Sequence, residues 1–237
     1  MAVKRDVHVC SLNARRGKLL PIDWNAHLAR ELERYRDGES RLPGIADPDT
    51  RQRQLTRLGN AAAGAGLALL MQGRREEAAG WLVRAAEHYR ESLDGAPPGS
   101  WGRPIGAMKA RILAGDPGVD EDARLALAMG AAEAESPIGR YAGCLALLVL
   151  GQDVEAEPPA SSLRGRCDFP PAVAAALWSL ARGDAASYST AAAEVLRSFE
   201  TRDKYLEDMP VADTVAVLEI LADARGIAAG VTSPLLP

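Results

Sequence analysis

Apolar residues recur along this chain at the three- and four-residue spacing of one face of an α-helix. The first such stripe consists of Trp24, Leu28, Leu32 and Tyr35. Capping residues, glycines and prolines divide the rest of the sequence into further helical segments, and Asp37-Gly38 is expected to end the first one. The expected helices lie at about 24–36, 48–72, 76–93, 105–114, 120–133, 138–150, 172–182, 185–200 and 211–225.

Three segments fall outside this helical pattern. Residues 1–20 show only a brief apolar alternation and are expected to form an irregular arm. Residues 151–171 contain four prolines and are expected to be the longest irregular loop, because proline lacks the N–H group that a helix interior needs. Residues 226–237 begin with the helix-ending Gly226 and are expected to form a C-terminal tail. We expect the whole chain, 1–237, to be a single domain.

The second half of the expected helix at 48–72 is almost free of polar groups and contains Gly59, Gly64 and Gly66. A glycine inside a helix costs about 1 kcal/mol relative to alanine. Such a cost is usually recovered where another helix packs very close. The sequence therefore predicts tight helix packing around this segment.

A short pattern repeats along the chain. The segments Leu67–Ala78 and Leu145–Ala156 are identical at seven of twelve positions, and looser copies surround Gly115 and Gly183. In each copy a helix ends at a glycine, and these glycines are 42, 36 and 32 residues apart. This interval is typical of helix-hairpin repeats, which bury their apolar faces by stacking on their neighbours.

Residues 62–89 resemble one tetratricopeptide-type unit. The matching positions are the close-packing pair Ala65-Gly66, Leu69 where the motif favours an aromatic residue, the turn Gly73–Ala78, and the core positions Leu82 and Ala85. The resemblance implies an all-α, TPR-like α-α array or solenoid of about eight to nine helices. Since the other copies are degenerate, we expect a compact array rather than a regular superhelix. Proteins of this kind bind protein or peptide partners in a groove.

The last third of the chain resembles, in the order of spaced single residues, the C-terminal half of immunity protein 49 family members. The residues that carry this resemblance are Leu180–Asp184, Tyr188, Val195, Leu196, Phe199, Tyr205, Pro210–Asp213 and Ser233–Pro237. Members of that family are helical proteins found beside polymorphic toxins. The resemblance implies a toxin-neutralising protein with a toxin-like gene next to its own.

Composition supports the helical prediction and excludes some functions. The chain has 44 Ala against 20 Ile plus Val, which favours helix over strand. Its net charge is −4, whereas a nucleic-acid-binding domain normally carries a basic excess. The most apolar run, Cys144–Leu150, is far shorter than the roughly 20 residues of a membrane span. With no secretory signal in the first residues and three widely spaced cysteines, we expect a cytoplasmic protein.

The sequence contains no catalytic, metal-binding or cofactor motif. The histidines His8, His27 and His88 lack ligand-pair spacing, and no phosphate-binding glycine loop or nucleophile elbow is present. We expect no cofactor and no metal, and the pattern favours a binding protein over an enzyme. A small-ligand site or an active site inside the array stays open, as does a homodimer.

The clearest candidate residues are those that could bind a partner. In a helical array the first helix of each hairpin lines a groove. Trp101 and Arg103 are of the residue types that dominate interface hot spots, since they bury large areas or bind carboxylates. The candidate binding residues are Trp101, Arg103, Lys109 and Arg111, with Arg140 and Tyr141 as weaker candidates. In the alternative interpretation, Trp101 fills the end of the core under its loop.

Overall fold

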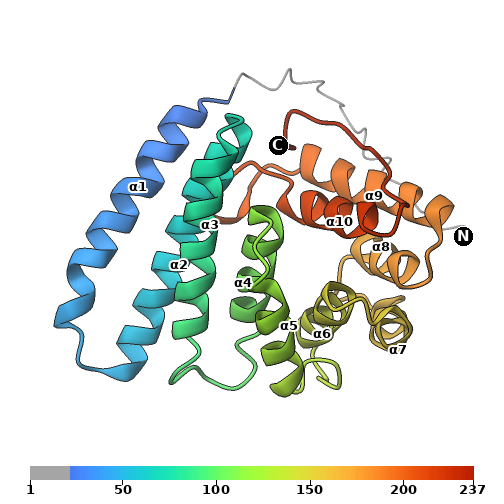
Figure 1. Cartoon of the computed structure of the whole chain (residues 1–237), viewed down its shortest axis with the longest axis horizontal. Coiled ribbons are helices and arrows are strands. Elements are labelled where there is room, and N and C mark those ends of the chain that lie inside the picture. Colours follow the sequence, from blue (N-terminus) through green and yellow to red (C-terminus); the bar gives the residue numbers. More distant parts are fainter. Residues whose placement is uncertain (1–21) are drawn as a thin grey trace, which may run out of the picture.

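A computed structural model describes residues 22–237, and these residues form ten α-helices and two short 3₁₀ helices without any β-strand (Figure 1). The α-helices are α1 (Trp24–Arg41), α2 (Pro48–Met71), α3 (Arg75–Glu91), α4 (Gly102–Ala114), α5 (Val119–Ala128), α6 (Pro137–Val149), α7 (Asp153–Leu163), α8 (Pro171–Ala181), α9 (Ala185–Glu200) and α10 (Asp213–Asp223). The 3₁₀ helices are η1 (Leu42–Gly44) and η2 (Leu206–Asp208). The prediction of an all-α protein is confirmed for this range, and the expected arm at 1–20 lies outside it.

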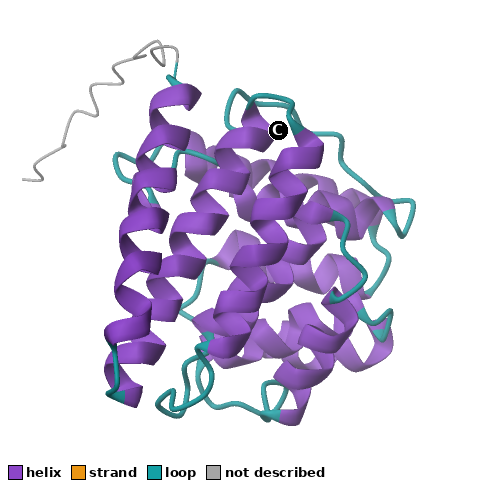
Figure 2. Ribbon diagram, turned by 60° about the vertical axis from the view of Figure 1, so that its left-hand side comes forward, coloured by secondary structure: helices purple, strands orange, loops and turns teal. Residues whose placement is uncertain are grey.

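The helices form a curved array in which each helix packs against the next one along the chain. The even-numbered helices also contact one another in order, from α2 through α4, α6 and α8 to α10, so they form the inner layer. The last helix, α10, turns back and packs against α4 in the middle of the array (Figure 1). Figure 2 shows the described residues from another side as packed helices joined by loops. The C-terminal part of the chain therefore closes much of the inner face.

Helix α2 is held between α1 and α3 at the three glycines that the sequence singled out. A Cβ atom on Gly59 would lie 2.7 Å from the ring of Tyr89, and one on Gly66 would lie 2.6 Å from Leu82, both in α3. A Cβ on Gly64 would lie 2.8 Å from Glu31 in α1. The predicted close packing around this segment is confirmed.

Helix α1 is longer than expected, because Asp37-Gly38 does not end it. Gly38 is buried in contact with α2, where Gln54 Nε2 donates a 2.9 Å hydrogen bond to its carbonyl oxygen. A Cβ at this position would lie 2.8 Å from Gln54 Nε2 and 2.9 Å from Leu58. The glycine thus permits close packing inside a helix rather than stopping it.

The prediction of an irregular loop over 151–171 is wrong for its first half, since α7 occupies residues 153–163 and includes Pro158 and Pro159. The two residues whose carbonyls lose a helical partner, Val154 and Glu155, are exposed, so water can satisfy them. The buried face is formed by Ala156, Pro159, Ala160 and Leu163. Burial of this face outweighs the cost of the prolines, and the described range contains one helix more than the expected maximum of nine.

The core divides into two main apolar clusters that meet at α4. One is built mainly from α1–α3 and the inner side of α4, and the other from α4–α10. The tail after α10 is anchored, because Leu235 is fully buried and its carbonyl oxygen accepts a 2.8 Å hydrogen bond from the Ala212 N–H. None of the helices described by the structure is long and apolar enough to span a membrane.

Stability is expected to fall as the pH is lowered from about 7 to about 5, because two half-buried histidines have lowered pKa values in the folded chain, which favours their neutral form. His88 Nε2 lies 2.8 Å from Tyr35 Oη, and burial lowers the pKa of His88 below its ordinary value of about 6.5. Its carboxylate neighbours Glu91 and Glu87 oppose this shift without reversing it. Burial lowers the pKa of His27 in the same direction.

A folded-state pKa below the unfolded-state value means that the unfolded chain takes up the proton first. This contribution to stability is therefore complete above about pH 6.5 and is lost as the pH falls through the folded pKa. Urea unfolding of the wild type and of His88→Gln at both pH values measures it. The variant is expected to lose less free energy of unfolding than the wild type on acidification, and an equal loss would contradict the assignment to His88.

Candidate binding groove

A groove of about 490 Å³ lies on the inner face of the array, between α2 and α4. One face of each helix lines it, and α3 forms its floor. The main side chains are Thr56, Asn60, Ala63 and Leu67 from α2, Leu82 and Tyr89 from α3, and Arg103, Ile105, Lys109 and Leu113 from α4. We refer to this space as the inner groove.

The two floor residues, Tyr89 and Leu82, show how the inner groove runs along α2 and α4. Tyr89 is wedged between two glycines, Gly59 of α2 and Gly106 of α4, where added Cβ atoms would lie 2.7 and 2.8 Å from its ring. Leu82 packs further along, at Gly66. The groove therefore has a polar end near the start of α4 and an apolar end towards Leu113.

Arg103 stands at the polar end and is 9% exposed. Its Nε donates a 3.1 Å hydrogen bond to Thr56 Oγ1, and its Nη2 donates to Gln52 Oε1. Its other terminal nitrogen, Nη1, is buried and has no hydrogen-bond partner in the described part of the chain. Burial lowers the pKa of the guanidinium, and Asp49 partly opposes that shift.

Lys109 lies near the middle of the groove and is neutralised there. Its Nζ is 2.5 Å from Asp213 Oδ2 at the start of α10 and donates a 3.1 Å hydrogen bond to Thr214 Oγ1. Burial acts to lower the pKa of Lys109, but the Asp213 carboxylate and Tyr141 together outweigh it, so the net shift is upward and the ammonium group is retained. This ion pair joins α4 to the returning α10.

Tyr89 in the floor of the groove and Asn60 in its α2 wall form a neutral polar pair. The Tyr89 hydroxyl donates a 2.9 Å hydrogen bond to Asn60 Oδ1. Burial raises the pKa of Tyr89 far above its ordinary value of about 10, so the phenol keeps its proton. The pair can offer hydrogen bonds to a ligand but holds no charge of its own.

The loop at 201–212, which we call the strap, crosses one side of the groove. Its η2 turn places two consecutive non-glycine residues, Glu207 and Asp208, in left-handed backbone conformations with φ of 54° and 53°. Such conformations persist only where the surroundings hold them. Leu206, in the same turn, lines the groove while 87% exposed.

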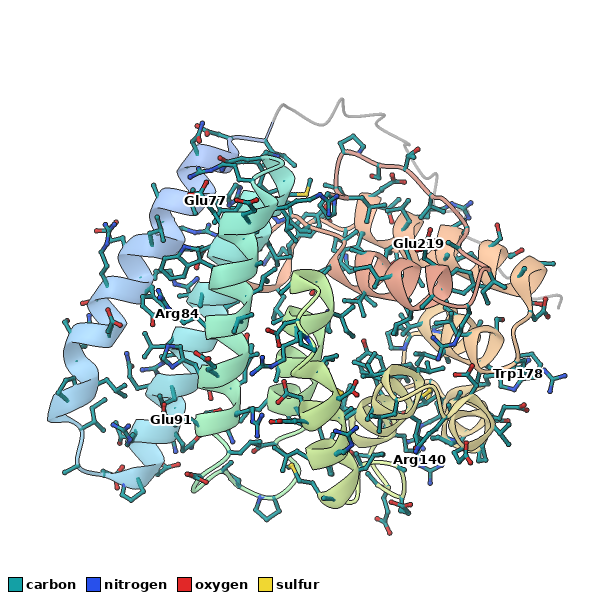
Figure 3. The ribbon with its side chains drawn as sticks, in the orientation of Figure 1. Glu77, Arg84, Glu91, Arg140, Trp178 and Glu219 are labelled. Carbon is teal, nitrogen blue, oxygen red and sulfur yellow. The ribbon has the colours of Figure 1, made fainter. Side chains whose placement is uncertain are left out.

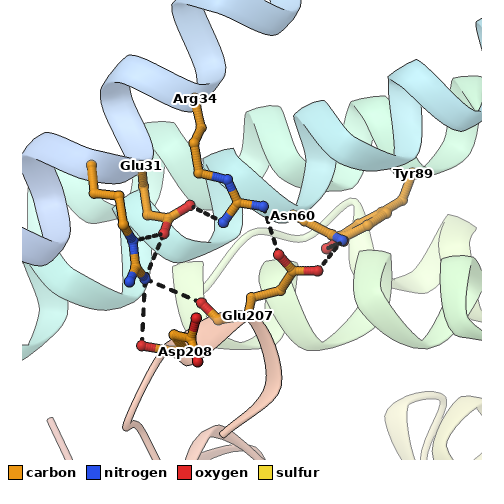
Figure 4. A network of polar contacts seen from close by, with 7 residues as sticks. Glu31, Arg34, Asn60, Tyr89, Glu207 and Asp208 are labelled. Atoms are coloured by element: carbon orange, nitrogen blue, oxygen red, sulfur yellow. Dashed lines mark hydrogen bonds and ion pairs between the residues drawn. The ribbon is translucent and has the colours of Figure 1, made fainter.

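A charge network holds the strap in place (Figure 4). Glu207 accepts hydrogen bonds from Arg34 Nη2 at 2.6 Å and from Asn60 Nδ2 at 3.0 Å. Arg30 Nη2 donates to the carbonyl oxygens of Glu207 and Asp208 at 3.1 and 3.4 Å. Both arginines also bind Glu31, a carboxylate in α1 that is 1% exposed. The strap is thus bound both to α1 and, through Asn60, to the α2 wall of the groove.

A second space of about 260 Å³ lies beneath the strap and shares Asn60, Leu67, Lys109 and Asp213 with the inner groove. Arg202 and Phe199 line its far side, and the Arg202 guanidinium carbon lies 3.7 Å from the centre of the Phe199 ring. The two spaces meet at the strap.

Of the six candidate residues from the sequence, two lie in the inner groove: Arg103 and Lys109. Arg111 is buried on the other side of α4, in ion pairs with Asp116 and Asp122. Trp101 is half-buried and packs against the larger core cluster, with its indole nitrogen 2.8 Å from where a Gly139 Cβ would stand. This position agrees with the alternative interpretation of Trp101.

The two weaker candidates lie on α6. Tyr141 packs against Phe169 with a ring-centre separation of 5.8 Å, and burial raises the pKa of its hydroxyl. Arg140 donates a 2.8 Å hydrogen bond to the Ala134 carbonyl oxygen, and Figure 3 shows it at the lower edge of the molecule. The structure does not bring these two residues together with Arg103.

Sequence reasoning missed several residues of the groove: Thr56, Asn60, Tyr89, Glu207 and Asp213. One signal was present, since Asn60 is a polar residue at the start of the otherwise apolar half of α2. Thr56 and Tyr89 come together through the packing of α2, α3 and α4, whereas the positions of Glu207 and Asp213 depend on how α10 returns to α4.

The cysteines carry no visible chemistry in the described range. Burial raises the pKa of Cys144 to about 12, and its Sγ lies 3.8 Å from the Ala156 carbonyl oxygen. Cys167 is exposed, and Cys10 lies outside the described residues. Within residues 22–237, no group of three or more His, Cys, Asp or Glu side chains is arranged to hold a metal ion.

Comparisons with known proteins add no family to this picture. No protein-family model, curated protein or solved structure matches the chain. The resemblances of residues 62–89 to a tetratricopeptide unit and of the last third to immunity protein 49 stay predictions.

Proposed function

We propose that this chain is a helical binding protein whose inner groove takes a short segment of a protein or peptide partner. The observation that carries this proposal is the groove itself, which is lined by matching faces of two inner helices and combines an apolar end with a polar end. In helical arrays the inner layer is the usual binding surface.

The dimensions of the groove suit a short extended segment. Thr56 and Leu67 mark its two ends on α2, eleven residues apart, which corresponds to about 16 Å along a helix. An extended chain advances about 3.3 Å per residue, so about five residues would fit. The neutral pair Tyr89–Asn60 offers hydrogen bonds to the backbone of such a segment.

The protonation states in the groove support binding rather than catalysis. The pKa of Tyr89 is raised and that of Lys109 is raised as well, so each keeps its proton near neutral pH. A general acid or base works best with a pKa near the operating pH. The pKa of neither residue is shifted towards neutral pH.

Filling the groove is expected to abolish partner binding. Ala63 lines the wall on α2, and Ala63→Phe would add a ring to the space that the segment occupies. A partner that co-purifies with the wild type from the native host is expected to be recovered at least about tenfold less with this variant, since one well-placed contact is worth about 1.4 kcal/mol or more. Quantitative mass spectrometry of the purified material measures the recovery.

Ala186→Phe is the matched control. Ala186 is exposed on α9, so this substitution adds the same ring away from the groove. It is expected to bind the partner like the wild type. Equal recovery with Ala63→Phe and the wild type, or no partner above background with the wild type, would contradict the proposal. A recovered partner that is a toxin, and whose toxicity falls when this chain is co-expressed, would favour the immunity-type alternative.

A further inference from the structure

We propose that the inner groove also binds a small amphipathic acid, with the ligand's carboxylate at Arg103 and its apolar body directed towards Leu113. This goes beyond the partner-binding proposal, because the ligand is a small molecule rather than a partner segment. It needs only the groove and the side chains that line it.

The first observation is the state of Arg103. Its guanidinium is nine-tenths buried, and its two bonded nitrogens donate to neutral oxygens of Thr56 and Gln52. Among the ion pairs of the described residues, none involves Arg103, and its Nη1 has no acceptor. A buried charge without a counter-charge and a buried donor without an acceptor are both unfavourable. A carboxylate at the polar end of the groove would supply the counter-charge, and it would become an acceptor for Nη1 when the side chain turns towards the groove, because Nη1 is shielded from solvent in this structure.

The second observation is the charge balance of the groove. Lys109 is paired with Asp213 at 2.5 Å, so Arg103 is the cation left without a carboxylate among the groove-lining residues. Arg103 also lies in the first turn of α4, which contains no acidic residue and has no side-chain cap. The positive end of the helix dipole therefore adds to the guanidinium charge. This balance favours a ligand with a single negative charge.

The third observation is the apolar surface next to this charge. Beyond the polar end, the walls are formed by Ala63, Leu67, Leu82, Ile105 and Leu113. The volume of about 490 Å³ falls within the range of about 300–1,000 Å³ that small-molecule sites occupy. A carboxylate joined to an aliphatic chain matches both ends of the groove.

Octanoate is a suitable probe, and isothermal titration calorimetry on the full chain measures its binding. We expect one molecule of octanoate to bind per chain, and octylamine, which has the same chain and the opposite charge, to bind at least about tenfold more weakly. Octan-1-ol, which carries no charge, is expected to bind more weakly than octanoate. Octylamine or octanol binding as tightly as octanoate would overturn the role of the carboxylate.

Substitutions locate the site. Arg103→Met is expected to weaken octanoate binding by about tenfold or more, since a hydrogen bond to a charged group is lost. Arg124→Met is the matched control, because Arg124 is exposed on α5 and pairs only with Asp120. Circular dichroism confirms that each variant is folded. Unchanged octanoate affinity in a folded Arg103→Met variant would overturn the proposal.

Ala63→Phe keeps the test decisive if Arg103→Met fails to fold. It leaves the guanidinium and its partners intact, fills the apolar part of the groove, and is expected to weaken octanoate binding while Ala186→Phe does not.

A tetrapeptide with one aspartate and two leucines tests whether the carboxylate comes from a small molecule or from a peptide. Arg103-dependent binding of this peptide without octanoate binding would overturn the small-molecule proposal and leave partner binding standing. Failure of partner capture does not affect the octanoate result.

Discussion

Replacing Gly143 with alanine is expected to lower the free energy of unfolding by about 3 kcal/mol, the upper part of the usual range for overpacking. Gly143 lies in α6, and a Cβ atom there would stand 2.5 Å from the Cα and N atoms of Ala132 and 2.7 Å from the carbonyl carbon of Ala131. These are backbone atoms, so a side-chain rotation cannot relieve the clash. The segment after α5 would have to move away from α6, where Ala131, Ala142 and Cys144 belong to the larger core cluster.

Gly80→Ala is the matched control for this substitution. Gly80 also lies inside a helix, but it is exposed on α3 and an added Cβ would meet no atom within 4 Å. Alanine is favoured over glycine in a helix by about 1 kcal/mol, so this variant is expected to be more stable than the wild type. Urea unfolding followed by circular dichroism measures both variants. The same sign of change in the two would contradict the packing described for α6.

Replacing Arg111 with methionine is expected to lower the free energy of unfolding by about 3–5 kcal/mol, as is usual when one partner of a buried ion pair is removed. Arg111 Nε donates to Asp122 Oδ2 at 2.8 Å, and its Nη1 lies 2.5 Å from Asp116 Oδ1. The Asp122 side chain is fully buried, and its remaining contact with Arg90 is 3.4 Å long. The substitution would therefore leave a poorly paired carboxylate in the core between α4 and α5.

The double variant Arg111→Met/Asp122→Leu separates the charge from the packing. It removes both partners of the pair, and apolar replacements of buried ion pairs are often neutral. We expect it to recover most of the stability lost in Arg111→Met. Arg124→Met, which breaks the exposed pair with Asp120 on α5, is expected to change stability by less than about 1 kcal/mol. A double variant no more stable than the single one would contradict this account of Arg111.

The contrast between Arg111 and Arg103 explains why one is structural and the other is the candidate for binding. Both lie on α4 and both are less than one-tenth exposed. Arg111 has two carboxylate partners, whereas Arg103 bonds only to the neutral side chains of Thr56 and Gln52. The sequence places the two residues together as binding candidates, because residue type and spacing do not reveal which carboxylates each one meets.

The sequence alone determined the described helices other than α7, and most of their ends. The cap-plus-proline starts at Asp47 and Ser136 form as expected, with Asp47 accepting from the Thr50 N–H at 2.8 Å and Ser136 from the Gly139 N–H at 3.1 Å. The helix-ending glycines Gly73, Gly115 and Gly151 have positive φ values. These signals are reliable because caps and helix hydrogen bonds join residues only three or four positions apart.

Tertiary structure decided where burial outweighs local preference, and which distant residues meet. Local rules break the chain at Gly38 and at Pro158, but both positions are helical because their segments pack against neighbouring helices. The groove joins Tyr89 to Asn60, Lys109 to Asp213 and Arg103 to Thr56. These pairs are 29 to 104 residues apart in the sequence, and the return of α10 to α4 brings the last segment into place. Spacing along one helix fixes which face a residue occupies, but only the packing of the whole array fixes what that face meets.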